Sequence, residues 1–237
     1  MTFEGKNILV AGGSSGIGLS LIKLLVSKGA TVYNVSRTAS EEWPEGVKHL
    51  TADVLSDLSA LASFLPEQLH GLVYSVGSIN LKPFNRLTED DFLNDYRLNV
   101  LGAVKTIQQA LKPLKSAGAA SVVLISSVAA RTGMGFHASI ASAKNAVEGL
   151  ALSLAAELAP QKIRVNVVAP SLTDTPLAGT LLNTPEKKEA SAKRHPLGAY
   201  GEPEDISAMI GFLLADESTW MTGQVIGIDG GMGKIKS

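Results

Sequence analysis

The stretch from Ser126 to Lys144 holds side chains that could perform carbonyl chemistry. Ser126 and Ser127 end an apolar run, and Lys144 lies on a predicted helix that begins near residue 138. Ile140 and His137 precede Lys144 at helical spacing, so the three share one helix face. A strand-end serine can hydrogen-bond a carbonyl oxygen, and a helical lysine can place positive charge nearby. Ile140 stands where such a site needs an acid, and it has no proton to give.

A glycine-rich turn forms a second candidate site, with the sequence Gly12-Gly13-Ser14-Ser15-Gly16-Ile17-Gly18. It follows the apolar run 7–11 and precedes a helical apolar pattern that ends at Gly29. Backbone N–H groups at a helix N-terminus attract phosphate, and glycines let the backbone approach it closely. The context therefore predicts dinucleotide binding. The alternative is an ordinary tight turn between a strand and a helix.

The residues after the second apolar run, 31–35, bear on the choice of dinucleotide. An acidic residue at this position binds the ribose 2′-OH of NAD(H), whereas an arginine accepts the 2′-phosphate of NADP(H). Residues 34–38 contain no acid and include Ser36, Arg37 and Thr38. Guanidinium and phosphate pair through two charge-assisted hydrogen bonds. The sequence favours NADP(H) over NAD(H), and the alternative is an exposed loop arginine.

Alternating strands and helices must position these side chains. We expect strands at 7–11, 31–35, 47–52, 70–76, 121–126, 163–169 and 225–231, and helices at 56–64, 88–113, 138–159 and from Pro203. Residues 176–200 are predicted to be a mobile insertion. This alternation predicts an α/β fold with one doubly wound parallel sheet. The candidate turns all follow strands, so they can converge on one crevice.

Composition excludes several classes of function. The 237 residues are 45% apolar and 18% charged, which fits one globular domain because no linker divides them. A net charge of −1 favours neither nucleic acid nor an anionic membrane. The absence of cysteine excludes disulfides and thiolate chemistry. No signal peptide or membrane span is predicted, so we expect a cytoplasmic protein. We predict no metal site.

The chain resembles the short-chain dehydrogenase/reductase family along nearly its whole length. The motifs that match are Gly12-x-x-x-Gly16-Ile17-Gly18, Asp53-Val54, Asn99-Val-x-Gly102, Ser126-Ser127, Lys144, Arg164-Val-Asn166, Asp174-Thr175-Pro176 and Thr222-Gly-Gln-x-x-x-x-Asp229-Gly-Gly. The resemblance implies a Rossmann-type sheet with strand order 3-2-1-4-5-6-7, a nicotinamide dinucleotide, a small-molecule substrate and a homodimer or homotetramer.

The resemblance also implies roles for single residues. Ser127 would polarise the substrate carbonyl, Lys144 would bind the nicotinamide ribose, and Asn99 would hold a water of the proton relay. The remaining candidates would bind cofactor. Gly12, Gly16 and Gly18 would form the phosphate turn, Asp53 would bind the adenine amino group, and Pro170 and Thr173 would line the nicotinamide carboxamide with Thr175 nearby. Ser14, Ser15, Ile17, Val54, Ser75 and Gly77 are further candidates for cofactor contact.

The chain departs from the family pattern in four places, one of which is Tyr74-Ser75-Val76-Gly77, where the family has Asn-Asn-Ala-Gly. The family's tyrosine, its general acid or base, is Ile140, and the glycine after Pro170 is Ser171. Tyr74 and Ala11 replace residues that link the first and fourth strands, and we interpret this change as repacking of a buried contact. Loss of the tyrosine predicts a slow oxidoreductase with an altered proton relay.

Several groups could compensate for the lost tyrosine. His137, near the helix N-terminus, could act as a base or position a water. The alternative is a histidine that only lines the mouth of the site. Lys144 could act through a water, whereas Ser139 and Ser142 are predicted to be helix-surface or capping residues.

Three functions remain open from the sequence. The first is an NADP(H)-dependent oxidoreductase that acts on an unidentified carbonyl or alcohol. The presence of Ser127, Lys144 and Asn99 supports it. The second is a non-catalytic NADP(H)-binding sensor or partner protein, which Ile140 favours. The third, a non-redox enzyme on the same scaffold, ranks last because the phosphate turn is intact and the tyrosine is gone.

Overall fold

A computed structural model describes residues 1–235 of the chain. Seven parallel strands form one sheet in the order β3-β2-β1-β4-β5-β6-β7, as the resemblance implied. The strands are β1 (Asn7–Ala11), β2 (Thr31–Ser36), β3 (Lys48–Thr51), β4 (Gly71–Tyr74), β5 (Ala120–Ile125), β6 (Ile163–Pro170) and β7 (Val225–Ile228). The central strands are runs of apolar residues because helices cover both faces of the sheet.

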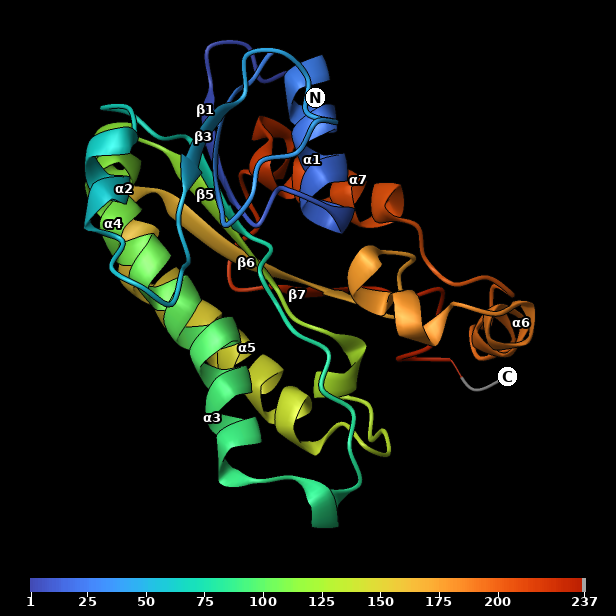
Figure 1. Cartoon of the computed structure of the whole chain (residues 1–237). Coiled ribbons are helices and arrows are strands. Elements are labelled where there is room, and N and C mark those ends of the chain that lie inside the picture. Colours follow the sequence, from blue (N-terminus) through green and yellow to red (C-terminus); the bar gives the residue numbers. More distant parts are fainter. Residues whose placement is uncertain (236–237) are drawn as a thin grey trace.

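Two helical layers sandwich the sheet (Figure 1). On one face, α1 (Gly16–Ser27) and α7 (Pro203–Leu214) pack together over a core that includes Leu21, Ile22 and Ile210. On the other lie α2 (Ser59–Phe64), α4 (Gly102–Ser116) and α5 (Ala138–Leu158). The sheet therefore holds the carboxyl ends of its strands, and the loops after them, in fixed positions.

Local sequence sets the ends of several helices. The chain leaves α1 through Gly29, whose φ of 89° lies in the left-handed region that glycine tolerates. Pro203 opens α7, and Glu202 and Asp205 form a reciprocal capping box. Thr88 and Asp91 form another at the start of α3 (Glu89–Tyr96).

The predicted helix over 88–113 is three elements in the structure. After α3, a π-helical turn η2 (Arg97–Leu101) precedes α4, which runs on to Ser116. The buried Tyr74 hydroxyl donates to the carbonyl oxygen of Leu98 at 2.6 Å, inside this turn. Burial raises the pKa of Tyr74, so the phenol keeps the proton that it donates. The tyrosine that departs from the family pattern thus packs from β4 against η2.

Other boundaries differ less from the prediction. The helix expected at 56–64 is shorter, because the Asp57 carboxylate binds the backbone N–H and hydroxyl of Ser59 at its start. Segment 176–200 contains a 3-10 helix, η5 (Pro176–Leu181), and α6 (Pro185–Lys193). Both lie beyond the carboxyl ends of β6 and β7 (Figure 1). The mobility of this segment stays a prediction. Four short 3-10 helices complete the described elements: η1 (Phe84–Arg86), η3 (Val128–Ala130), η4 (Ala159–Gln161) and η6 (Asp216–Ser218).

Candidate active site

The glycine-rich turn is packed too tightly at its glycines to admit a side chain there. Gly12 and Gly16 have φ values of 87° and 54°, and a Cβ on Gly18 would lie 2.1 Å from the Gly12 carbonyl oxygen. Ser15 precedes α1 with an extended backbone, and its side chain caps none of the first N–H groups of the helix. These N–H groups are suited to an anion, so the turn fits a dinucleotide phosphate.

Gly13 and Asn34 also shape this end of the site, which the sequence reasoning missed. The buried Asn34 accepts the N–H of Gly13 at 2.9 Å and donates to the Ser36 hydroxyl at 2.7 Å. Ser36 in turn donates to the carbonyl of Thr38. Trp43 covers the turn, since its indole N–H donates to the Gly13 carbonyl oxygen at 2.7 Å.

Arg37 is exposed, directly after β2. At the end of β3, the half-buried Asp53 accepts the N–H of Leu55 at 2.9 Å, and Val54 is buried. These residues sit at the carboxyl ends of neighbouring strands, as a cofactor site for the adenosine half requires.

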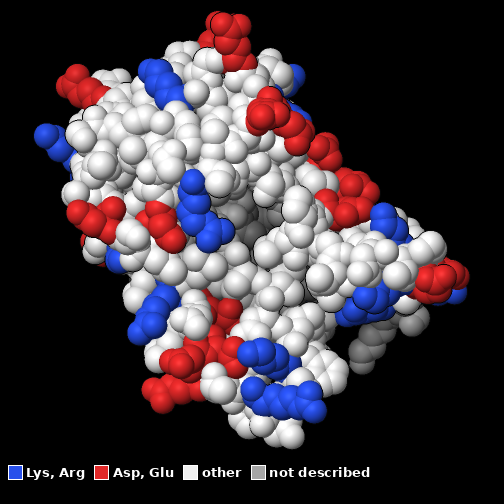
Figure 2. Space-filling view, in the orientation of Figure 1, with Lys and Arg blue, Asp and Glu red and all other residues white. Residues whose placement is uncertain are grey.

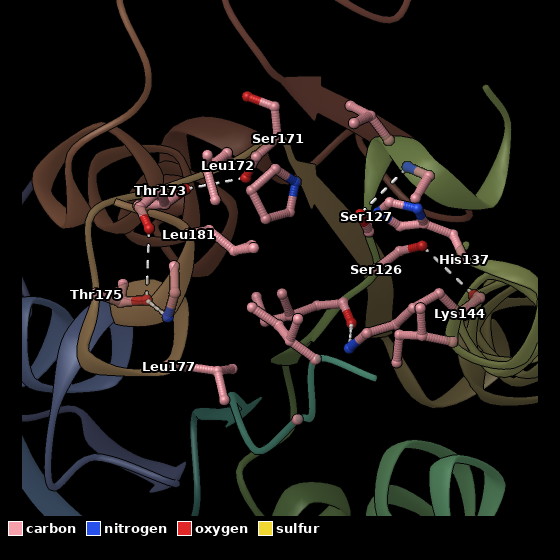
Figure 3. A pocket seen from close by; sticks show the side chains of 18 of the residues that line it. Ser126, Ser127, His137, Lys144, Ser171, Leu172, Thr173, Thr175, Leu177 and Leu181 are labelled. Atoms are coloured by element: carbon pink, nitrogen blue, oxygen red, sulfur yellow. Dashed lines mark hydrogen bonds between the residues drawn. The ribbon is translucent and has the colours of Figure 1, made fainter. Parts of the chain in front are cut away.

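A cavity of about 300 Å³ opens at the carboxyl ends of the central strands (Figure 3). Figure 2 shows a hollow on this face with basic side chains beside it. The cavity gathers many predicted site residues from separate segments: Ile17, Ser75, Gly77, Ser127, His137, Lys144, Pro170, Thr173 and Thr175. The predicted residues that do not line it are Gly12, Ser14, Ser15, Gly16, Gly18, Ser36, Arg37, Thr38, Asp53, Val54 and Asn99.

Apolar side chains form much of the cavity wall. Leu177 and Leu181 come from η5, and Leu81, Met134, Leu172 and Met232 come from loops. In Figure 3, Thr173, Thr175 and Leu177 lie across the cavity from Ser127, His137 and Lys144. An apolar wall around few polar groups is typical of a small-molecule site.

The two serines after β5 have different partners. Ser126 is buried, and its hydroxyl donates to Glu148 at 2.8 Å, which also accepts a hydrogen bond from Arg131. Ser127 accepts the N–H of Ala129 at 3.2 Å, and its own hydroxyl proton remains available to a ligand. Ser127 is therefore the serine that can hydrogen-bond a carbonyl in the cavity.

Lys144 is buried at the base of the cavity. Its Nζ donates to the carbonyl oxygen of Ile125 at 2.8 Å. Burial lowers the pKa of Lys144 to about 8, although the negative charge of Asp95 raises it in part. Its side chain can therefore exchange between the ammonium and the neutral amine slightly above neutral pH.

Ile140 lies on the same helix, 6% exposed, and lines the cavity without any polar atom. His137 precedes the first turn of α5 and is half-buried. Its Nδ1 donates to the carbonyl oxygen of Gly135 at 2.6 Å, so in the neutral ring Nε2 carries the free lone pair. His137 can accept a proton or hold a water.

Asn99 is buried and does not line the cavity, but its side-chain amide is near Lys144. Among residues 1–235, its Oδ1 is a buried side-chain oxygen without a hydrogen-bond partner. Its Nδ2 donates to Ser78 and to the backbone carbonyl of Asp95. Oδ1 and the Lys144 Nζ lie 3.3 and 3.4 Å from the point where a Cβ on Gly77 would be. Because Gly77 has no side chain, both atoms face one spot beside its Cα, where a small polar group such as a water would find two polar partners.

The structure corrects the prediction for Ser139. It is 1% exposed and donates to the Asp95 carboxylate, so it is no surface residue. The exposed Ser142 donates to the backbone of its own helix, at Ala138. The prediction failed because α3 packs against the first turn of α5, a contact with no local sequence signal.

The sequence reasoning also missed a hydrogen-bonded pair, His195 and Ser171. The buried His195 donates from Nδ1 to the Ser191 carbonyl oxygen at 2.8 Å, and its Nε2 lies 2.8 Å from the Ser171 hydroxyl. Both His195 and Ser171 line the cavity. The only sequence signal was Ser171 itself, at a position where the family has glycine.

Comparison with known proteins gives matches over nearly the whole chain. The family model described as enoyl-(acyl carrier protein) reductase matches residues 11–233. L-xylulose reductase from Bos taurus is 34% identical over 242 residues, covering 98% of each chain. A short-chain type dehydrogenase/reductase from Mycobacterium ulcerans has 29% identity and a TM-score of 0.90, over 98% of this chain and 91% of that one.

A solved variant of ElxO with NADPH bound is 26% identical, with a TM-score of 0.86 over 96% of this chain and 98% of that one. Within residues 1–235, no helix has the length and apolar character to cross a membrane. From sequence motifs, strand order and these matches, the chain belongs to the short-chain dehydrogenase/reductase family and is an oxidoreductase of that type.

Proposed function

We propose that this protein is an NADP(H)-dependent oxidoreductase that interconverts a carbonyl compound and an alcohol through an altered proton relay. One observation carries the proposal. Ser127 and Lys144 line the same cavity, while the position four before Lys144 is Ile140. The groups that polarise a carbonyl and bind a nucleotide ribose are present, and the proton donor between them is replaced.

The polar residues that would meet the substrate and the cofactor then have separate tasks. The Ser127 hydroxyl donates to the substrate oxygen and stabilises the charge that develops there. The Lys144 ammonium binds ribose hydroxyls, with Thr173 and Thr175 lining the opposite side. When bound, the nicotinamide supplies or accepts the hydride. The apolar wall excludes water and strengthens these electrostatic contacts.

Proton delivery falls to Lys144 in this proposal. A water between its Nζ and the Asn99 Oδ1 would carry the proton to the alkoxide, and Lys144 would be recharged from solvent. A pKa of about 8 suits this exchange. His137 is the alternative group, because its free Nε2 could position the water instead.

The preference for NADP(H) rests on Arg37. It follows β2 with no acidic residue from 34 to 38, and the turn beside it is ordered by Asn34. A guanidinium there suits a 2′-phosphate. Of the similar solved structures, the ElxO variant holds NADPH and a 3-ketoacyl-(acyl-carrier-protein) reductase holds NADH, so the choice is argued from Arg37.

Titration with NADPH and NADH, followed by a panel of aldehydes, ketones and quinones, tests the proposal. We expect tighter binding of NADPH and slow oxidation of it by at least one substrate. Ser127→Ala should abolish that turnover, whereas Ser142→Ala, an exposed change on α5, should leave it unchanged. NADPH binding without turnover on any substrate would refute the oxidoreductase.

Ile140 favours a second candidate, a non-catalytic NADP(H)-binding sensor or partner protein. It predicts that Ile140→Tyr also shows no turnover, although NADPH still binds. A captured active homologue would support the partner role.

We also propose a single domain with segment 176–200 as a substrate lid, in a homodimer or homotetramer in the cytoplasm. Leu101 and Leu152 are 40% and 62% exposed on the layer of η2, α4 and α5, so this face has apolar area to bury. Light scattering of the purified protein gives the number of subunits.

A further inference from the structure

Asp95 is a buried carboxylate next to Asn99, which belongs to the proposed proton relay with Lys144. It lies on α3, is 3% exposed, and belongs to no motif that the sequence analysis singled out. Three side chains point hydrogen-bond donors at it. The hydroxyls of Ser78 and Ser139 donate at 2.7 and 2.5 Å, and the amide of Asn80 donates at 3.5 Å. Because every partner donates, the surroundings suit an ionised acceptor.

The hydrogen bond from Ser78 sets the orientation of Asn99. Ser78 gives its only proton to Asp95, so its oxygen must accept from its other neighbour, the Asn99 Nδ2 at 3.1 Å. The same Nδ2 also donates to the Asp95 backbone carbonyl at 2.8 Å. With the amide nitrogen held on this side, Oδ1 faces the spot that it shares with the Lys144 Nζ.

The second carboxylate oxygen binds α5. Ser139 precedes Ile140 directly and donates to Asp95, and α3 packs against α5. Asp95 therefore connects α3 to the first turn of α5, where Ile140 replaces the family's tyrosine. Asp91, one turn earlier, has a different role, because it caps α3 and pairs with Lys82 at 2.6 Å.

We propose that Asp95 is a positioning residue for the proton relay: through Ser78 it fixes Asn99 with Oδ1 toward Lys144, and it sets a negative charge near that ammonium group. The inference deepens the proposed function and rests on it. The charge of Asp95 also raises the pKa of Lys144 against the effect of burial. Asp95 keeps Lys144 protonated at a higher pH than burial alone would allow.

Other charges around Lys144 come from several elements. His137 and Glu148 belong to the α5 region, and Glu148 is paired with Arg131 at 2.7 Å. His195 and Arg194 line the same cavity from the segment after α6. The described segments β5 and 75–78, which also face Lys144, hold no titratable side chain. Asp95 is thus the acid that α3 contributes to this site.

Two measurements on Asp95→Asn test the inference. In the spectrum of protein labelled with ¹³C-lysine, the Lys144 signal is identified by its absence from Lys144→Arg. We expect its titration midpoint in Asp95→Asn to fall by roughly half a pH unit or more, because an attractive charge is lost. In NADPH-dependent turnover, kcat should fall at least about tenfold while KM for NADPH changes little.

Matched variants separate the two effects of Asp95. Asp90→Asn removes an exposed charge from the same helix and should change neither measurement. Ser78→Ala keeps the charge of Asp95 but breaks the link to Asn99. It should lower kcat and leave the Lys144 midpoint in place. Ser78→Ala still decides the positioning role if Asp95→Asn does not fold.

The two proposals fail in different ways. If the wild-type protein has no NADPH-dependent turnover, the proposed oxidoreductase fails, and the proposed role in catalysis falls with it. The claim that the charge of Asp95 raises the pKa of Lys144 is then tested by the titration alone. An unchanged Lys144 midpoint in Asp95→Asn overturns that claim. Normal kcat in both Asp95→Asn and Ser78→Ala, with active wild type, overturns the inference and leaves the oxidoreductase intact.

Discussion

Replacing Ile140 with tyrosine restores the missing proton donor and is the most informative substitution. The Ile140 side chain lines the cavity one helical turn before Lys144. A phenol at this position would extend toward the cavity, near an ammonium group that lowers its pKa. A positioned proton donor is worth about 10²–10⁴ in rate, or roughly 3–5.5 kcal/mol of barrier.

The larger ring also has a cost. Ile140 is 6% exposed, so part of the new side chain must fit against packed neighbours. Overpacking typically costs about 1–3 kcal/mol in stability. The cavity of about 300 Å³ in front of Ile140 can take up some of this volume. We therefore expect Ile140→Tyr to fold and to bind NADPH as the wild type does.

The assay compares kcat/KM for one carbonyl substrate with NADPH across wild type, Ile140→Tyr and Ile140→Phe. Phenylalanine has the same ring without the hydroxyl, so it controls for changes of shape. We expect a gain of about 10²-fold or more for tyrosine only. Equal rates for the tyrosine and phenylalanine variants, with NADPH bound in both, would refute the reasoning that the proton donor is the defect.

Three further predictions concern the cofactor, the pH dependence and the phosphate turn. Arg37→Ala should weaken NADPH binding about 10- to 100-fold in calorimetry, because a charge-assisted hydrogen bond is worth about 1.5–3 kcal/mol. NADH binding, measured by the same calorimetry, should be unchanged. Equal losses of affinity for NADPH and NADH would exclude a 2′-phosphate contact. Lys144 has a pKa of about 8, so its protonated fraction, and with it the rate of carbonyl reduction, should fall as pH rises through that value. Alcohol oxidation should rise over the same range, and a flat pH profile for both directions would contradict proton delivery by Lys144. Gly18→Ala should lose dinucleotide binding, because its Cβ would lie 2.1 Å from the Gly12 carbonyl oxygen, and normal NADPH binding by this variant would contradict the close packing of the turn. The control is Gly149→Ala, on an open face of α5, which should stabilise the fold by about 0.5–1 kcal/mol in urea unfolding.

Much of the fold followed from patterns that are local in the sequence. The apolar runs and the glycine-rich turn predicted the strands and the first helix, because burial on both faces and tight backbone packing each leave a clear signature. The resemblance supplied the strand order, which the structure confirms. Ser127, His137 and Lys144 were also placed together in advance, since the end of β5 and the start of α5 are close in the chain.

Contacts between distant segments could not be predicted in this way. The π-helical turn at 97–101 accompanies a hydrogen bond from Tyr74, and a helical apolar pattern does not reveal it. Ser139 was expected at the surface, yet it binds Asp95 across two packed helices. The pair of His195 and Ser171 joins the segment after α6 to the end of β6. These polar contacts depend on tertiary packing alone.

Transfer of a labelled hydride tests the central claim most directly. NADPH carrying deuterium at C4 of the nicotinamide, in separate preparations for each face, is incubated with the wild-type protein and the carbonyl panel. The alcohol product is then analysed by mass spectrometry. We predict deuterium on the carbinol carbon from one of the two preparations, with Ser127→Ala giving none. Saturated NADPH binding with no deuterium in any product from either preparation would contradict the account.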